Sequence, residues 1–557
     1  MRHFLYFFIV LFIFSCKEKT STEEPSNQNE EPVKDSISIG VTTFKDAEVK
    51  DFREFKVLDS KYIDASELWS QFDKQLESFT ETDYEQLKPL IIEQDIPTLH
   101  KNISDGKLNY EKLTKFYLYR IRKFDRENDL SLNSVIALNP DVIEEAKQAD
   151  RIRFVDAPHP IFGMPILLKD NINASGMPTT AGAVALKDNK TEDAFIVQQL
   201  KKQGAIILGK TNLSEWAYFF CGDCPSGYSA IGGQTLNPYG RRVFDTGGSS
   251  SGSGVAMSAN FAVAAIGSET SGSILSPSSA NSIVGLKPTI GLVSRSGIVP
   301  ISSTLDTAGP MTKSVIDNAI VLDAMFGEDT TDSKSIYALW LNGFYYEELP
   351  QSKSLHGKRF GAFKRLMTDS LYVEALEDLK ALGAKIVEVE EGARQLPNFI
   401  NLLNLDMRND LPQYLNVYAN PSIEVKSVSD IIEFNRKDSL NMMPYGQKLF
   451  NGIVADEGDE ATLKTIKDSL HHIGKAFFDR PQKENKLDGF LSINNYHASL
   501  AAVAEYPAIT VPMGYEVNGK PKGLTFIGKR LSEKQLLEYA YAFEQATKKR
   551  RTPKNYD

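Results

Sequence analysis

Short apolar runs alternate with helical patterns along most of the chain, and this alternation restricts the fold more than any other feature of the sequence. Four such runs occupy residues 161–168, 205–208, 262–266 and 384–389. Between them, segments such as residues 107–123 repeat apolar side chains at steps of three and four, which is typical of an amphipathic helix. Short buried strands separated by helices predict an α/β layer architecture around a mostly buried sheet.

Composition excludes several classes of protein. The 557 residues include 37 Gly, 25 Pro and 10% aromatic residues, proportions that do not fit collagen, a coiled coil or a disordered chain. Acidic residues outnumber basic ones, 73 to 63, and the formal net charge is −10. Because affinity for nucleic acid depends on a surplus of Lys and Arg on one face, we expect no nucleic-acid partner. Small molecules or peptides are the expected ligands.

The amino-terminal segment reads as an export signal. Arg2 and His3 precede eleven apolar residues, 4–14, which are followed by Ser15 and Cys16. A membrane-spanning helix needs about 20 apolar residues, so this apolar segment is too short to cross a bilayer. A basic start, an apolar middle and a small residue before the cut are typical of a signal peptide.

The end of this segment is similar to a bacterial lipoprotein signal, Ile-Phe-Ser-Cys. The similarity implies that residues 1–15 are removed and that Cys16 becomes a lipidated amino terminus. We therefore expect an exported, membrane-anchored lipoprotein, periplasmic or at the cell surface, with a conventional signal peptide cut nearby as the alternative. Residues 16–36 contain a single aliphatic side chain and predict a flexible tether. Residues 37–60 form an extension without a predicted structure, and the remaining domain spans residues 61–557.

Two cysteines follow Cys16, in the sequence Cys221-Gly-Asp-Cys224. In an oxidising compartment such a pair is either a structural disulfide or two free thiols, and the sequence leaves both open. Zinc would need two further Cys or His ligands at suitable spacing, and among the seven histidines only the adjacent His471 and His472 form a pair. We expect no metal.

Two short motifs point to functions that their surroundings do not support. Residues 204–211, GAIILGKT, match a phosphate-binding loop, but the variable positions are themselves strand-like and a helix-like segment ends at Gly204. Residues 248–252, GSSSG, match the nucleophile elbow of α/β-hydrolases, with Ser250 as nucleophile and His497 as base. The elbow requires an apolar strand before it, whereas the preceding segment is short and polar.

A third set of motifs covers far more of the chain. Residues 247–310 contain GGSSSGSG and GSETSGSILSPSS, with FGMPILLKDNI and LGKTNLSEWA upstream and EYPAITVPMGY downstream. In this order they resemble the amidase signature family, most closely its peptide amidase branch, over roughly residues 90–550. The resemblance implies an α/β fold with one large mixed β-sheet covered by helices on both faces. It also implies an amidase domain over residues 61–557, and no cofactor.

The resemblance assigns a set of catalytic residues. Ser273 matches the nucleophile, Ser249 the bridging serine and Lys169 the base, and the two serines have the family's offset of 24 residues. The peptide bond between Gly248 and Ser249 is expected to be cis. The implied oxyanion hole consists of the backbone N–H groups of Thr270, Ser271, Gly272 and Ser273.

These residue types suit amide hydrolysis, which needs a base that takes a proton from the nucleophile and returns one to the leaving amine. A lysine does this only when neutral, so its pKa must fall by about three units from about 10.4. Lys169 follows the apolar residues 166–168, which predicts a position at the end of a buried strand, where desolvation disfavours the ammonium form. Ser249 then relays the proton. Glu269 and Asp306 either support the site from behind or form structural ion pairs.

The segment after the nucleophile indicates the kind of substrate. Several relatives carry Arg there, in some of which it meets a substrate carboxylate, whereas this sequence has Leu275 and Ser276. We therefore expect a neutral carboxamide or peptide amide, hydrolysed with release of ammonia or amine. The alternatives are the glutamine-hydrolysing subunit of a tRNA-dependent amidotransferase, which export disfavours, and an inactive lipoprotein that binds peptides or amides.

The remaining predictions concern the carboxy-terminal half. Residues 325–480 contain helices and turns without a chemical motif, and we expect them to wall the substrate pocket. Ser532 with Gln535 predicts a capping box at the start of a helix. The basic residues 548–551 after that helix are expected to lie in solvent and to complement the helix dipole.

Overall fold

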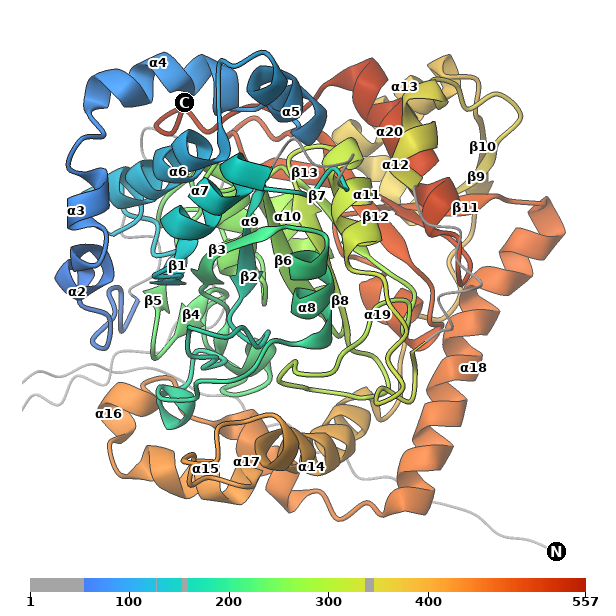
Figure 1. The fold of residues 1–557 in the computed structure, drawn as a ribbon. Helices are drawn as coiled ribbons and strands as arrows, with labels where there is room; N and C mark the ends of the chain where they lie inside the picture. Colours follow the sequence, from blue (N-terminus) through green and yellow to red (C-terminus); the bar gives the residue numbers. More distant parts are fainter. Residues whose placement is uncertain (1–54, 127, 153–158, 336–344) are drawn as a thin grey trace, which may run out of the picture. The chain divides into compact units, whose positions relative to one another are not determined.

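A mixed sheet of 11 strands lies at the centre of the fold (Figure 1). The structure is a computed structural model and describes residues 55–557 except 127, 153–158 and 336–344. The strand order is β1-β3-β2-β6-β8-β7-β12-β13-β11-β9-β10. Strand β2 is parallel to β3 and β6, β9 is parallel to β10 and β11, and the other neighbours are antiparallel. The predicted α/β architecture with one large mixed sheet is confirmed.

The strands of this sheet are β1 (Val135–Leu138), β2 (Pro165–Lys169), β3 (Ile206–Thr211), β6 (Ala264–Glu269), β7 (Val284–Lys287), β8 (Thr307–Thr312), β9 (Arg359–Phe363), β10 (Lys385–Val389), β11 (Gly489–Ile493), β12 (Ala508–Tyr515) and β13 (Pro521–Ile527). Strands β4 (Tyr228–Ser229) and β5 (Gly233–Gln234) pair separately. The predicted signal peptide, the lipidated Cys16 and the tether lie outside the described residues.

All four predicted strands form, and local hydrogen bonds decide where the elements begin. The strand expected at 161–168 starts only at Pro165, because Met164 N donates to Ile161 O at 3.1 Å and closes a turn. The helix expected at 107–123 is α6 (Tyr110–Phe124). It starts later than predicted because the Asn109 side chain accepts a hydrogen bond from Lys112 N at 2.8 Å and caps it.

Helices surround the sheet in two groups that concern the site. Helices α9 (Ser251–Ser258) and α10 (Leu275–Ala280) contact each other. Helix α9 also packs against β2 and β6, and α10 packs against β7, β12 and β13. Helices α11 (Val315–Ala324) and α20 (Glu533–Thr547) also contact each other, with α11 on β8 and α20 on β12. The starts of α9 and α10 come directly after the two predicted catalytic serines.

A second helical group follows β10 in the sequence, and in the view of Figure 1 its helices α14 to α17 lie below the sheet while α18 runs up along its right-hand side. Its members contact one another and share a hydrophobic core with the loop around Trp216 and Phe220. They are α14 (Phe399–Val417), α15 (Val428–Arg436), α16 (Ser439–Met442), α17 (Lys448–Ala455) and α18 (Glu460–Asn485). The other helices are α2 (Ala65–Ser70), α3 (Asp73–Leu76), α4 (Glu81–Ile91), α5 (Ile96–Ser104), α7 (Val142–Ile152), α8 (Phe195–Lys202), α12 (Tyr345–Glu348), α13 (Ser370–Ala381) and α19 (Ala498–Val503).

The predicted capping box is wrong, and the prediction that residues 548–551 lie in solvent holds for Lys548 and Arg551 but not for Arg550. Ser532 precedes α20 but forms no capping box, because its hydroxyl donates to Lys529 O at 2.6 Å instead. Arg550, expected in solvent, is mostly covered and donates to both carboxylate oxygens of Glu93 at 2.7 and 2.8 Å and to Ser282 O at 2.7 Å. The chain after α20 folds back against the end of α4, and a carboxylate there binds the guanidinium.

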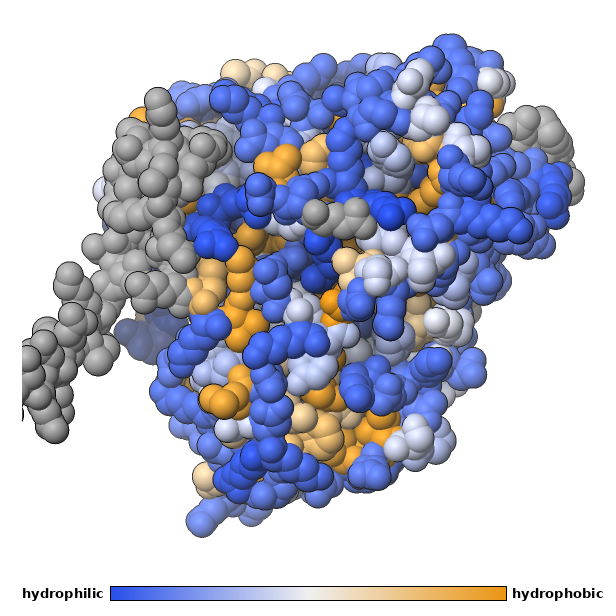
Figure 2. Space-filling view, turned by 90° about the vertical axis from the view of Figure 1, so that its left-hand side faces the viewer, coloured by the Kyte–Doolittle hydropathy of each residue, from blue (hydrophilic) through white to orange (hydrophobic). Residues whose placement is uncertain are grey.

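The surface on the side of α2 to α4 is mostly hydrophilic, with hydrophobic residues visible in small separate groups (Figure 2). Among the helices of the described ranges, none has the length and apolar content needed to cross a bilayer.

Candidate active site

Lys169 ends strand β2 and has no exposed surface, as predicted from the apolar residues before it. Its Nζ donates to the hydroxyl of Ser249 at 2.7 Å, to the hydroxyl of Ser268 at 2.9 Å and to the backbone carbonyl of Ser268 at 3.1 Å. Strand β2 lies between β3 and β6, and helix α9 contacts β2, so Lys169 lies in the interior of the fold.

Burial lowers the pKa of Lys169 from 10.5 to about 7, because desolvation penalises the ammonium form. The carboxylates of Asp306 and Glu269 act in the opposite direction, and their effect is smaller. Near pH 7, Lys169 is therefore a neutral amine in a substantial fraction of the molecules, and a neutral amine accepts protons.

Ser249 lies between the β-sheet and helix α9 and is fully buried. The peptide bond between Gly248 and Ser249 is cis, as expected from the resemblance. The Ser249 carbonyl accepts from Ser214 N at 3.0 Å, which ties the bond to the neighbouring loop. A Cβ atom on Gly248 would lie 2.7 Å from the hydroxyl of Ser214, so glycine is the residue that fits before Ser249.

Ser273 lies between β6 and α10 and is partly exposed, whereas Lys169 and Ser249 are buried. Its carbonyl accepts from Ser250 N at 3.1 Å, which joins the loop before α10 to the loop before α9. In the described part of the chain, the Ser273 hydroxyl has no hydrogen-bond partner. The structure thus links Lys169 directly to Ser249 and brings the backbones of the two serine loops together.

The turn from Thr270 to Ser273 is held from both sides. The Thr270 hydroxyl donates to Asp306 Oδ1 at 2.5 Å, and the Ser271 hydroxyl lies 2.6 Å from that of Ser499. Gly272 has φ +100°, a conformation that favours glycine. Within the described ranges, the N–H groups of Thr270, Ser271 and Ser273 donate to no protein acceptor, while that of Gly272 interacts with a carboxylate.

That carboxylate belongs to Glu269, the last residue of β6. Its Oε2 accepts from Ile274 N at 2.7 Å and from Leu275 N at 3.0 Å, at the start of α10. Burial raises the pKa of Glu269 and also that of Asp306. Of the two roles left open for these carboxylates, the structure gives them the supporting one, since both bind the turn that carries Ser273.

The two alternative motifs do not form sites. Ser250 is buried and its hydroxyl donates to Ser268 O at 3.0 Å, and no strand precedes it within residues 241–246. His497 binds Ser492 at 2.6 Å and Glu391 at 3.2 Å through its two ring nitrogens, so neither nitrogen serves Ser250. The nucleophile-elbow interpretation is therefore excluded.

The apparent phosphate-binding loop is strand β3, as expected from its composition. Lys210 at its end is fully buried, forms an ion pair with Asp170 at 3.3 Å and donates to the Thr179 hydroxyl at 3.0 Å. No backbone cradle for phosphate exists along an extended strand.

Comparison with known proteins identifies the chain. The family model described as Amidase matches residues 112–464, more than half of the chain. The chain belongs to the amidase signature family. A probable amidase of Arabidopsis thaliana is 36% identical over 483 residues, covering 83% of this chain and 92% of that protein. The chain is accordingly an amidase, an enzyme that hydrolyses carbon–nitrogen bonds.

Solved structures resemble this amidase along most of its length. An amidase family protein from Bacillus anthracis is 36% identical with a TM-score of 0.85, covering 89% of this chain and all of the other. The native peptide amidase of Stenotrophomonas maltophilia is 40% identical with a TM-score of 0.76, covering 83% of this chain and 98% of the other.

A pocket of about 190 Å³ opens beside Thr270 and Ser268 of the amidase. Helix α14 supplies part of its wall, so the stretch without a chemical motif does line a pocket next to the site. Further lining residues include Asn171, Ala217, Arg295, Asp306, Asp410 and Tyr414.

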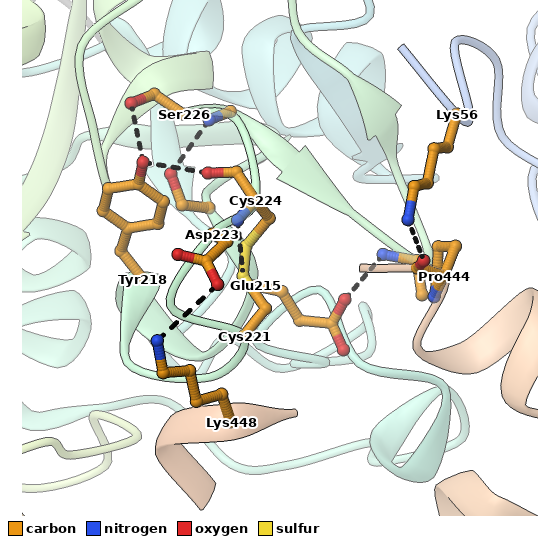
Figure 3. The surroundings of a disulfide bond; sticks show 12 residues. Lys56, Glu215, Tyr218, Cys221, Asp223, Cys224, Ser226, Pro444 and Lys448 are labelled. Carbon is orange, nitrogen blue, oxygen red and sulfur yellow. Dashed lines mark hydrogen bonds and ion pairs between the residues drawn. A yellow bond between two sulfur atoms is a disulfide. The ribbon is translucent and has the colours of Figure 1, made fainter. Parts of the chain in front are cut away.

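A disulfide between Cys221 and Cys224 holds the loop that reaches this pocket (Figure 3). The Tyr218 hydroxyl donates to Cys224 O at 3.0 Å, and Lys448 of α17 lies 3.8 Å from the Asp223 carboxylate. Ala217, within the same loop, lines the pocket and has φ +54°. Of the two states that the sequence left open, the structure has the disulfide.

Two polar residues near the amine of Lys169, Ser268 and Asn171, were not predicted from the sequence. Asn171 Nδ2 donates to the Ser268 hydroxyl at 2.9 Å, and that hydroxyl also accepts from Lys169. A signal was present, since Ser268 comes two residues after the apolar run that ends at Ile266, and Asn171 comes two residues after Lys169. Polar residues inside a buried run need a partner.

Proposed function

We propose that this amidase hydrolyses carboxamides through Ser273 as nucleophile, Ser249 as bridging residue and Lys169 as base. The observation that carries this proposal is the 2.7 Å hydrogen bond between Lys169 Nζ and the Ser249 hydroxyl, both of which are fully buried. A buried lysine whose pKa is about 7 is poised to exchange protons near neutrality.

In the first half-reaction, Lys169 takes the proton of Ser249, which takes that of Ser273, and the Ser273 oxygen attacks the amide carbon. The N–H groups of the turn that are unoccupied in the described structure, those of Thr270, Ser271 and Ser273, are the donors for the oxyanion, and such a donor typically contributes about 2.7–4 kcal/mol. The C–N bond then breaks, and the proton returns through Ser249 to the leaving nitrogen. Ammonia or an amine departs and an acyl-enzyme remains on Ser273.

In the second half-reaction, water loses a proton to the same relay and attacks the ester of the acyl-enzyme. The acid is released and the Ser273 hydroxyl is restored. No cofactor or metal takes part in these steps.

The proposed substrates are peptide amides or other neutral carboxamides. Leu275 and Ser276 bring no positive charge to the position after the nucleophile, which removes one means of binding a substrate carboxylate. The 40% identity to a peptide amidase supports the same substrate class. We also propose an exported lipoprotein anchored through Cys16, without a nucleic-acid partner.

The test is ammonia release from a panel of peptide amides, simple carboxamides and glutamine. Ser273→Ala and Lys169→Ala should abolish release, while the exposed controls Ser422→Ala and Lys437→Ala should leave it intact. Release that persists in Ser273→Ala would refute the nucleophile. Glutamine as the sole substrate would favour an amidotransferase-like subunit, and binding without release would favour a peptide-binding lipoprotein.

A further inference from the structure

Charged side chains give the pocket beside Thr270 a negative balance. Its ionisable lining residues include one cation, Arg295, and three carboxylates, Asp306, Asp332 and Asp410. Arg295 and Asp332 form a two-pronged ion pair, with Nε donating to Oδ2 at 2.9 Å and a second nitrogen donating to Oδ1. This pairing leaves Asp306 and Asp410 without an ion-paired cation in the part of the chain that the structure describes.

These two carboxylates differ in how their oxygens are used. Both oxygens of Asp306 accept hydrogen bonds from within the protein, one from the Thr270 hydroxyl and the other from two backbone N–H groups of the preceding loop. Asp410 lies on α14, and its Oδ2 accepts from Ser303 N at 2.6 Å. Ser303 brings no positive charge, so Asp410 keeps its own charge available to the pocket.

A neutral polar group of the pocket lacks a hydrogen-bond donor. Asn171 is 2% exposed and lines the pocket, and its Oδ1 has no hydrogen-bond partner within the described residues. Its Nδ2 already donates to the Ser268 hydroxyl. A buried carbonyl oxygen without a partner is costly, so a bound group that donates hydrogen bonds would be favoured there.

We propose that the pocket selects amide substrates with an ammonium or guanidinium group close to the scissile carboxamide, and that Asp410 is the residue that selects them. This inference rests on the proposed amide hydrolysis and narrows its substrates from peptide amides and neutral carboxamides to peptide amides that carry a positive charge. A cavity of about 190 Å³ has room for an amino-acid-sized group. A basic residue at the amidated end of a peptide meets both requirements.

The surroundings of Asp410 predict how this selectivity depends on pH. Burial and, to a smaller extent, the nearby carboxylates of Asp406 and Asp306 raise the pKa of Asp410 to about 6, against the hydrogen bonds from Ser303. Arg295 is the cation that faces it, while Lys467 of α18 is paired with Asp406 at 2.8 Å. Asp410 is therefore ionised at pH 8 and becomes protonated below about pH 6, where the preference for cations should fade.

The experiment compares kcat/KM at pH 8 for N-acetyl-lysinamide and N-acetyl-norleucinamide, which are similar in length and differ in charge. We expect the lysine amide to be preferred about tenfold, the ratio that 1.4 kcal/mol of charge attraction gives. Asp410→Asn should bring the ratio close to one. Glu424→Gln, an exposed carboxylate outside the pocket, should leave the ratio unchanged and serves as the matched control.

Three results overturn the inference while leaving the proposed function in place. They are equal kcat/KM values for the two amides, a preference that survives Asp410→Asn, and a preference that is the same at pH 5 and pH 8. Failure of the proposed function looks different, because neither amide would then release ammonia or release would persist in Ser273→Ala.

Discussion

At the scale of single residues, the site depends on a lysine surrounded by hydroxyl and carbonyl oxygens. Ser249 and Ser268 accept from Lys169, and the nearest carboxylates, Asp306 and Glu269, are engaged by the turn that carries Ser273. Desolvation therefore outweighs the attraction of these carboxylates, and the amine loses its proton near neutrality.

The first prediction concerns pH. Because only neutral Lys169 accepts a proton, kcat/KM for N-acetyl-norleucinamide should rise with pH through about 7 and fall about tenfold per unit below it. The uncharged side chain keeps the titration of Asp410 out of the profile. Lys169→Arg, which stays charged, should be inactive from pH 6 to pH 9. A flat wild-type profile over this range would contradict the assignment.

The second prediction concerns Gly272. Gly272→Ala places a Cβ 2.9 Å from the Asn495 amide at φ +100°, so we expect a loss of about 1–3 kcal/mol in unfolding free energy. It also displaces oxyanion donors, so kcat should fall about 10²-fold or more. Gly446→Ala, at φ +78° with open space around it, is the control. Urea unfolding and steady-state kinetics of both variants provide the measurements, and equal kcat losses would oppose the prediction.

Much of this site was predictable from the sequence, because its motifs are local. The position of Lys169 after three apolar residues is enough to predict burial, and burial sets its pKa. The pocket was not predictable, since Arg295 and Asp410 meet only after more than 100 residues have folded between them. Local patterns carry no information about such distant pairings.

At the scale of elements, strands were easier to predict than their first and last residues. Apolar runs fixed the existence of β2, β3, β6 and β10, whereas side-chain caps and turns fixed their limits. Ser532 illustrates the difficulty. Its sequence context satisfies the capping-box pattern, but its hydroxyl binds Lys529 O, an acceptor that the pattern does not consider.

The third prediction concerns the disulfide loop. In the Cys221→Ser/Cys224→Ser variant, we expect the unfolding free energy to fall by about 2 kcal/mol, because the loop that the disulfide closes is short. Ala217 of the same loop lines the pocket, so loosening the loop should disturb substrate binding. KM should therefore rise more than kcat falls. Urea unfolding with and without reductant gives the stability change. Two reactive thiols in the unreduced native protein would argue against the disulfide.

At the scale of the whole molecule, the segment after α20 fastens distant parts together. Arg550 binds Glu93 at the end of α4 and the backbone carbonyl of Ser282. The ion pair lowers the pKa of Glu93 from 4.5 to about 2. For a carboxylate whose pKa falls on folding, the stabilisation is complete above about pH 4.5 and is lost as pH falls towards 2.

The fourth prediction follows from this contact. Arg550→Met should lower the unfolding free energy at pH 7 by about 2 kcal/mol, because it removes a covered guanidinium that binds both oxygens of the partly exposed Glu93 carboxylate. The deficit should shrink between pH 4.5 and pH 3, as Glu93 becomes protonated. Lys549→Met removes the neighbouring cation, whose nearer partner Glu374 is 56% exposed, and should cost no more than about 1 kcal/mol. Equal losses in the two variants would count against the prediction.

The order of strands in the sheet also governs how this protein can be made. Strand β7 pairs with β12, and in the described sheet β9 and β10 connect to the other strands through β11 and β13, which follow them by more than 100 residues. A growing chain therefore presents an open strand edge at β7 until residue 515, the end of β12, has left the ribosome. We expect folding during synthesis to rely on chaperones that cover this edge, because the sheet is incomplete until its last strands have been synthesised.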